Sequence, residues 1–150
     1  MKMSYKEEEL PKVASLVLSN SPKNEKGVTI IALSGPLGAG KTSLTQAIAK
    51  DLGIEEKVVS PTFVIAKWYK PTKGDFEVLV HIDAYRFDSE EELAPLRFDS
   101  LVKESKTLII IEWPERLPKA LSENHASLFI LEHDGDIRKI EGPMSYEKRK

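Results

Sequence analysis

The sequence predicts a three-layer α/β domain built on a mixed sheet of parallel and antiparallel strands, and three observations carry this prediction. First, residues 28–33 form a short apolar, β-branched run typical of a buried strand, and a glycine-rich loop follows it directly. Second, residues 43–52 follow that loop with apolar side chains at helical spacing. Third, two later pairs of strand-like runs are each joined by turn residues, which indicates antiparallel hairpins.

A helix is expected before the first strand. Ser4 and Glu7 have the spacing of a capping box, which predicts an amphipathic helix that runs to about Leu18. Pro11 interrupts that pattern, and because proline is favoured in the first turn of a helix, Pro11 is the alternative start. The polar residues 19–27 are then a loop.

The helix after the glycine loop is expected to stop at Gly53, and a hairpin follows it. Residues 58–69 contain a turn and then a strand, and residues 76–83 form the returning strand. The residues between them, 71–75, read Pro-Thr-Lys-Gly-Asp, which is the composition of a turn.

Two helical segments are expected before the most apolar strand of the chain. Ser89 and Glu92 repeat the capping-box spacing and predict a helix over 90–96, and a further short helix is expected over 98–104. Residues 107–112 read Thr-Leu-Ile-Ile-Ile-Glu, a run typical of a central strand that is covered on both faces.

The C-terminal part is expected to form a second hairpin. A short helix over 115–121 precedes it, and the strand-like runs 127–132 and 137–140 flank an Asp-Gly turn. The polar residues 143–150 are expected to be a frayed tail.

Composition limits the class of protein. A chain of 150 residues is expected to form one domain, 1–150, with a single core. The net charge of −2 provides no overall basic footprint for nucleic acid, and the absence of cysteine excludes disulfides and cysteine-ligated metals. Because we find neither a secretion signal nor an apolar run of membrane-spanning length, we expect a cytoplasmic location and no membrane partner.

The glycine-rich loop carries the strongest chemical signal in the sequence. Residues 35–42 read Gly-Pro-Leu-Gly-Ala-Gly-Lys-Thr and match the phosphate-binding pattern G-x-x-x-x-G-K-[ST] between a strand and a helix. Backbone N–H groups of such a loop and the start of the helix attract phosphate. We therefore expect Lys41 to bind the β- and γ-phosphates of a nucleotide and the Thr42 hydroxyl to ligate Mg²⁺. The fold class becomes a P-loop NTPase-like domain.

A phosphate loop needs a carboxylate near its magnesium, and two strand ends provide one. Glu112 ends the apolar run 107–112, and Asp83 ends the run 76–83. Both are expected at the C-terminal edge of the sheet, where open α/β sheets bind ligands. Glu112 is the preferred metal ligand or water-polarising group because its strand is the more apolar. Asp83 is expected either to share the metal or to orient Thr42.

Three further residues have both a functional and a structural interpretation. Thr62 lies in Ser-Pro-Thr-Phe, 60–63, where its hydroxyl could reach the γ-phosphate or Mg²⁺, as switch segments do. His81 shares a strand face with Asp83 and would orient a carboxylate, ligate a metal or serve only the core. Trp113 would pack against the nucleotide or a partner, or it would be a half-buried residue with only a structural role.

Four segments together resemble the TsaE family of bacterial ATPases that act in tRNA threonylcarbamoyladenosine biosynthesis. They are the phosphate loop with its preceding strand, the Ser-Pro-Thr-Phe segment, His-Ile-Asp-Ala-Tyr-Arg at 81–86 and Ile-Glu-Trp-Pro-Glu at 111–115. Their order and approximate spacing are those of the family, and the resemblance spans about residues 4–141. The resemblance implies binding and hydrolysis of ATP with Mg²⁺ on the TsaB–TsaD pair, which modifies tRNA, so that tRNA is a partner only through that complex.

The resemblance also implies residue roles. Lys41, Glu112, Asp83 and Thr62 would be catalytic, and Thr42 and Glu112 would hold Mg²⁺. The N-terminal segment near Ser4–Glu7 and the last hairpin near Arg138 would border the adenine. Together with the chemistry of the loop, this gives a nucleotide-binding set of Gly35, Leu37, Gly38, Ala39, Gly40, Lys41, Thr42, Ser43 and Arg138.

Two alternatives remain at this point. The same loop serves small-molecule kinases, although the sequence has no arginine-rich lid segment of the kind that such kinases use. A nucleotide-gated binding module without useful turnover is the other.

Pro36 stands where the family usually has aspartate, and it removes a backbone N–H. Phosphate binding is expected to survive this change, while the hydrolysis rate or a partner contact could differ.

Overall fold

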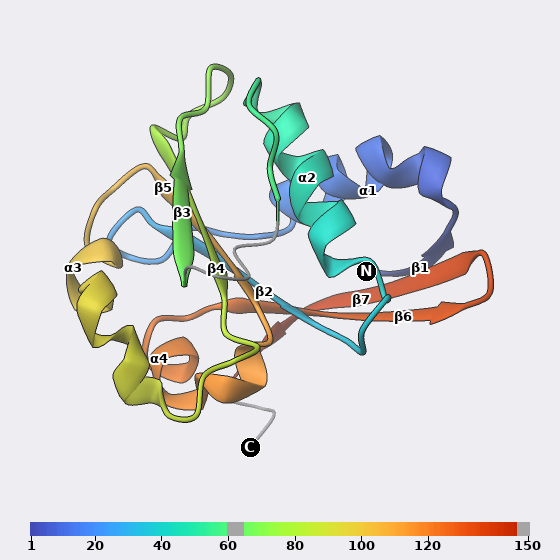
Figure 1. The fold of residues 1–150 in the computed structure, drawn as a ribbon. Helices are drawn as coiled ribbons and strands as arrows, with labels where there is room; N and C mark the ends of the chain where they lie inside the picture. Colours follow the sequence, from blue (N-terminus) through green and yellow to red (C-terminus); the bar gives the residue numbers. More distant parts are fainter. Residues whose placement is uncertain (60–64, 147–150) are drawn as a thin grey trace.

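The computed structural model describes residues 1–59 and 65–146 and places all seven strands in one sheet, in the order β1-β7-β6-β2-β5-β4-β3 (Figure 1). The strands are β1 Lys2–Tyr5, β2 Thr29–Ser34, β3 Ala66–Tyr69, β4 Val78–Asp83, β5 Thr107–Glu112, β6 Ser127–Asp134 and β7 Ile137–Ser145. The helices are α1 Leu10–Ser19, α2 Lys41–Asp51, α3 Phe98–Leu101 and α4 Pro118–Glu123, with 3₁₀ segments η1 Glu7–Glu9, η2 Glu90–Leu96 and η3 Pro114–Arg116.

The sheet is mixed, as the sequence predicts. Strand β2 pairs in parallel with β5 and β6, and β4 pairs in parallel with β5. The outer pairs β3–β4, β6–β7 and β1–β7 are antiparallel. Every residue of β5 is buried, which confirms the central strand expected over 107–112. Both expected hairpins, β3–β4 and β6–β7, are present.

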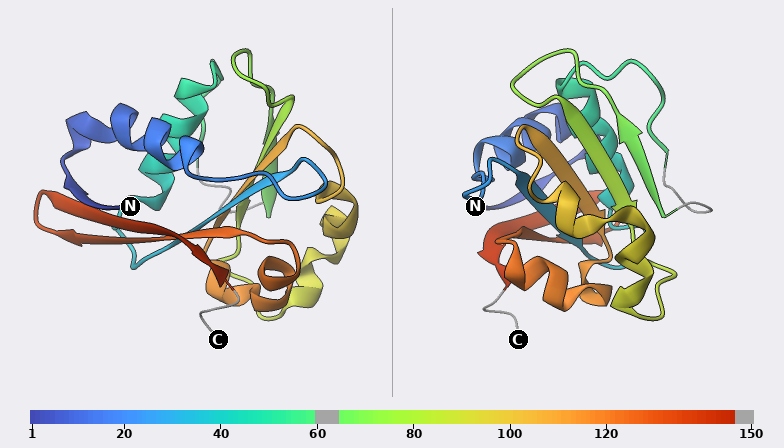
Figure 2. Two further views of the ribbon diagram at one scale, coloured as in Figure 1. Left: turned by 180° about the vertical axis from the view of Figure 1, so that it is seen from behind. Right: turned by 90° about the vertical axis from the view of Figure 1, so that its left-hand side faces the viewer.

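Helices cover the two faces of the sheet, which confirms the three-layer arrangement. The single core expected from chain length is instead two apolar cores, because the sheet separates the side chains on its two faces. Helices α1 and α2 pack on one face, with Leu44 and Ile48 of α2 in the first core. Segments η2, α3 and α4 cover the other face, where Phe98 and Leu121 belong to the second core (Figure 2).

Side chains alternate between the two faces along each strand. This alternation determines which residues at the C-terminal ends of the parallel strands point toward α2. Leu108 and Ile110 of β5 lie in the core under α1 and α2, whereas the residues between them lie in the opposite core. Because side chains alternate with a period of two, Glu112 emerges on the α2 face. The same rule places His81 and Asp83 of β4 on that face, in continuation of buried Leu79.

The N-terminal prediction needs a correction. Ser4 does not cap a helix; it lies in β1, opposite Lys139 of β7. Helix α1 begins at Leu10 with Pro11 in its first turn, so the alternative start is confirmed. The physical reason is that β7 offers a row of backbone hydrogen-bond partners to residues 2–5, and this long-range pairing outweighs a local capping pattern.

Other boundaries also differ from prediction. Residues 90–96 form a 3₁₀ segment with Pro95 inside, because proline has no N–H for an α-helical bond. The helix expected over 115–121 is divided into η3 and α4, the latter with proline in its first turn. Residues 143–145, expected in the frayed tail, belong instead to β7, where Ser145 pairs with Ser127.

Within residues 1–59 and 65–146, we find no helix with the length and apolar character needed to cross a membrane.

Candidate functional site

The phosphate loop, the first turn of α2 and the ends of two parallel strands line one pocket of about 390 Å³. The loop joins β2 to α2, and Asp83 and Glu112 are register partners where β4 and β5 end. The remaining walls are Tyr85, Trp113 and Arg138. This volume lies within the range of small-ligand pockets. The site therefore forms at the strand edge where the sequence predicts it.

Two glycines of the loop occupy positions where a side chain would not fit. A Cβ on Gly35 would lie 2.4 Å from the backbone oxygen of Leu131, so the loop approaches β6 too closely for any other residue. Gly40 has φ +101°, and a Cβ there would lie 2.8 Å from Nη1 of Arg138. Glycine at these two positions lets the loop turn tightly against β6 and Arg138, as the backbone of a phosphate-binding loop requires.

Lys41 begins α2, and its ammonium group lies beside the loop. Nζ donates to the carbonyl oxygen of Gly35 and, at 3.1 Å, to that of Pro36. It also lies 3.9 Å from the ring centroid of Trp113, a cation–π distance. Burial lowers the pKa of the Lys41 ammonium, and the nearby carboxylates of Glu112, Glu115 and Asp83 act in the opposite direction. A desolvated cation that faces a pocket is a favourable partner for phosphate oxygens.

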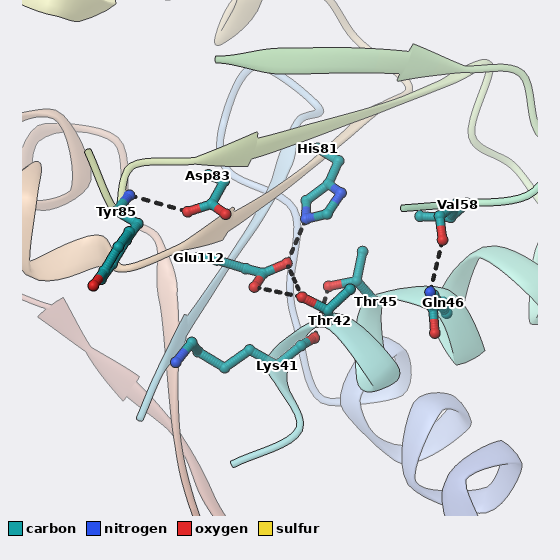
Figure 3. Close-up of polar contacts among 9 residues, drawn as sticks. All are labelled: Lys41, Thr42, Thr45, Gln46, Val58, His81, Asp83, Tyr85 and Glu112. Atoms are coloured by element: carbon teal, nitrogen blue, oxygen red, sulfur yellow. Dashed lines mark hydrogen bonds and ion pairs between the residues drawn. The ribbon is translucent and has the colours of Figure 1, made fainter. Parts of the chain in front are cut away.

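Three side chains form a hydrogen-bonded chain, as Figure 3 shows, and two of them, Thr42 and Glu112, line the pocket. The Thr42 hydroxyl donates to both carboxylate oxygens of Glu112, at 3.0 and 3.2 Å. Nε2 of His81 lies 2.5 Å from Oε2 of the same carboxylate. Glu112 is 2% exposed, so it depends on these donors in place of water. Because the single hydroxyl proton of Thr42 faces Glu112, its oxygen lone pairs are left for a cation.

Asp83 and two aromatic residues, Tyr85 and Trp113, also line the pocket, and Asp83 lies beside Glu112 in the register of β4 and β5. Oδ1 of Asp83 accepts a hydrogen bond from the backbone N–H of Tyr85 at 3.0 Å. The rings of Tyr85 and Trp113 are in contact, with centroids 4.9 Å apart. Behind the loop, the side chain of Gln46 donates to the carbonyl oxygen of Val58 at 2.7 Å, which fixes α2 to the segment that precedes residue 60.

Arg138 comes from β7, almost a hundred residues after the loop, and completes the pocket. Its Nη1 is buried and lacks a hydrogen-bond partner among the described residues. The same group lies against Gly40, as its distance to a Cβ there indicates. An unpaired guanidinium nitrogen beside a phosphate loop fits an anionic ligand, because Arg binds phosphate oxygens through charge-assisted hydrogen bonds. Tyr5 of β1 is the register partner of Arg138, so the N-terminal segment adjoins this corner.

The donor set fits magnesium only together with a phosphate ligand. In the described part of the chain, no three His, Asp or Glu side chains gather closely enough to hold a metal ion. Thr42 and Glu112 nevertheless offer oxygen atoms, which Mg²⁺ prefers, and Mg²⁺ is commonly held by one or two protein groups plus substrate phosphates.

Of the predicted catalytic and nucleotide-binding residues that the structure describes, Gly35 belongs to the loop but does not line the pocket, and the others line it together. Thr62 lies outside the described residues. Of the interpretations left open for His81, orientation of a carboxylate is the one that the geometry favours. Tyr85 was not predicted as a pocket residue, although its strand-face alternation with His81 and Asp83 was the signal available. Asp83 was one candidate for the carboxylate that orients Thr42. The hydrogen bonds of the Thr42 hydroxyl go to Glu112.

Comparison with known proteins identifies the family. The family model described as "Threonylcarbamoyl adenosine biosynthesis protein TsaE" matches residues 4–140. The "tRNA threonylcarbamoyladenosine biosynthesis protein TsaE" of Mycobacterium tuberculosis is 35% identical over 124 residues, 77% of this chain and 73% of that protein. The protein of the same name from Streptomyces coelicolor is 43% identical over 108 residues, 71% of each chain. The crystal structure of Bacillus subtilis YdiB matches with a TM-score of 0.70 and 25% identity over 99% of this chain and 88% of that one, which confirms the P-loop fold.

The lowered pKa of Lys41 predicts how stability changes with pH. Between the lowered native pKa and the ordinary value of 10.5, the unfolded chain binds more protons than the native chain. The free energy of unfolding of the wild type should therefore rise with pH in that window, relative to a Lys41→Met variant that has no such proton. Urea unfolding of both proteins from neutral to alkaline pH measures this difference. A difference that stays constant or changes in the opposite direction would contradict the assignment.

Proposed function

Because the chain belongs to the TsaE family of tRNA threonylcarbamoyladenosine biosynthesis proteins, we propose that it acts in this pathway as a Mg²⁺-dependent ATPase. The observation that carries the proposal is the hydrogen bond from Thr42 to the buried carboxylate of Glu112, beside Lys41 in one pocket. It combines a phosphate-binding cation with two oxygen donors for a metal. The choice of ATP over other nucleotides rests on the family.

The roles of the loop follow from its geometry. Backbone N–H groups of residues 35–43 and the ammonium of Lys41 bind the β- and γ-phosphates. Lys41 must exchange its contacts with the carbonyl groups of Gly35 and Pro36 for phosphate oxygens, which are stronger acceptors because they are charged. The unpaired Nη1 of Arg138 donates an N–H hydrogen bond to the nucleotide from the side of β7.

Magnesium, when bound with the nucleotide, neutralises charge that develops on the phosphate oxygens. Thr42 and Glu112 are the residues that would hold it. Oε1 of Glu112, which His81 does not contact, and the carboxylate of Asp83 can accept a hydrogen bond from an attacking water. We assign Thr62 to the γ-phosphate side on the resemblance of its segment.

Exposed apolar side chains at the mouth of the pocket support a partner-dependent activity. Among the described residues, the large hydrophobic side chains with substantial exposure are Leu37 (68%), Trp68 (48%) and Tyr85 (42%). Leu37 and Tyr85 both line the pocket. An apolar rim around a nucleotide site fits docking of another protein over it. We propose that this protein is the TsaB–TsaD pair and that intrinsic hydrolysis without it is weak.

Substitution of Lys41 and substitution of Glu112 should both reduce ATP hydrolysis, but for different reasons. Lys41→Ala should weaken nucleotide binding, whereas Glu112→Ala should leave binding in EDTA unchanged and lower ATP turnover by a factor of about 10²–10³. Both are measured by phosphate release and by titration with a fluorescent ATP analogue. Glu104→Ala removes an exposed carboxylate that does not line the pocket and is the matched control.

Two other outcomes would identify the alternatives. If both variants lose hydrolysis but still complement a strain that lacks the gene, the chain is a nucleotide-gated binding module. If the isolated chain transfers phosphate from ATP to a nucleoside or another metabolite, it is a kinase and the ATPase proposal is wrong.

The apolar rim predicts where the TsaB–TsaD pair binds. Leu37→Asp should weaken ATP-dependent capture of the pair at least about fivefold, because a charge in the centre of an interface is strongly unfavourable. Trp68→Ser changes an exposed aromatic residue on β3, which does not line the pocket, and should leave capture unchanged. Pull-down with ATP or ADP measures both. Equal capture by Leu37→Asp and wild type would exclude this rim as the docking surface.

A further inference from the structure

His81 is a buried polar residue that the proposed chemistry does not yet use. It is 0% exposed on the α2 face of β4, opposite Ile110 of β5. Its Nδ1 is buried and has no hydrogen-bond partner among the described residues. A buried polar atom without a partner lowers stability, so an apolar side chain of similar size would suit the core better. The contact made by the other ring nitrogen is therefore the feature that distinguishes histidine from an apolar residue here.

The other nitrogen, Nε2, contacts Oε2 of Glu112 at 2.5 Å. A carboxylate offers only acceptors, so Nε2 is assigned as the donor of this hydrogen bond. Thr42 donates to the same carboxylate from α2. Figure 3 shows Glu112 between the two donors, which belong to different layers of the domain. Two donors from separate elements fix both the position and the rotation of the carboxylate plane.

His81 does not share the pocket wall with Glu112 and Thr42. It lies behind the carboxylate, so it can orient Glu112 but has no direct path to a ligand. We propose that His81 is a positioning residue for the ATPase reaction, holding the Glu112 carboxylate where it serves magnesium and water. This inference rests on the proposed ATPase function.

Loss of His81 would leave Glu112 with only the Thr42 hydroxyl as a described donor, in a site with almost no access for water. Lys41 lines the same pocket and carries the opposite charge. The carboxylate would then turn toward that ammonium and withdraw from the metal position. Nucleotide binding without metal should be unaffected, because the loop amides and Lys41 remain in place.

Three substitutions of His81 separate this role from a packing role. His81→Leu removes both nitrogens. His81→Gln places an amide N–H₂ at about the reach of Nε2, whereas His81→Asn places one only at the reach of Nδ1. His125→Asn is the control for loss of an exposed histidine, at a left-handed position that asparagine tolerates. Thermal unfolding of each full-length variant reports on folding.

The measurements are the affinity for a fluorescent ATP analogue in EDTA and in Mg²⁺, the KM and kcat for ATP in the presence of the TsaB–TsaD pair, and the Mg²⁺ concentration that gives half-maximal rate. We expect His81→Leu to lower kcat about 10- to 100-fold and to raise the Mg²⁺ midpoint, with affinity in EDTA unchanged. His81→Gln should have a kcat and a Mg²⁺ midpoint close to those of the wild type, whereas His81→Asn should behave like His81→Leu.

Equal kcat and equal Mg²⁺ midpoint in wild type and a folded His81→Leu would overturn the inference and leave the ATPase proposal intact. If His81→Leu does not fold, the comparison of His81→Gln with His81→Asn tests the inference. An equal loss of kcat in these two variants would show that a donor at the reach of Nε2 is irrelevant and would overturn it. A wild-type chain without Mg²⁺-dependent nucleotide binding or turnover would instead remove the proposed function and this inference with it.

Discussion

The hydrogen bond between Thr42 and the buried carboxylate of Glu112 is the interaction on which the site depends. It connects the first turn of α2 to the end of the central strand β5, so it holds the end of the phosphate loop against the strand edge. A carboxylate that is almost fully removed from water is stable only when donors surround it. The donors present, a hydroxyl and an imidazole, leave part of its acceptor capacity available on the pocket side.

The parallel pairing of β2, β4 and β5 makes this arrangement possible. Parallel strands end at the same edge, so the loop after β2 and the carboxylates of Asp83 and Glu112 meet without any long insertion. The later hairpin β6–β7 then returns along β2 and brings Arg138 against Gly40. A domain of this size thereby surrounds a pocket from four separate parts of the chain, while the mouth of the pocket stays open and partly apolar.

Much of the fold and site can be predicted because the signals are local. The strand, glycine loop and helix are consecutive, and Glu112 ends an apolar run that only a covered central strand would tolerate. The error at the N-terminus comes from long-range pairing, because Ser4 has a capping spacing but pairs with β7 as part of a strand. The contact of His81 with Glu112 likewise depends on the register of β4 against β5, which no local pattern encodes. Arg138 was placed at the site only by family resemblance.

A crystal structure of the chain with Mg²⁺ and a non-hydrolysable ATP analogue tests the account most directly. The account predicts that the loop amides and Lys41 surround the β- and γ-phosphates, that the Thr42 hydroxyl ligates the ion, and that Glu112 contacts it directly or through one water. A triphosphate bound outside this loop, or a metal ion with Glu112 turned away from it, would contradict the account.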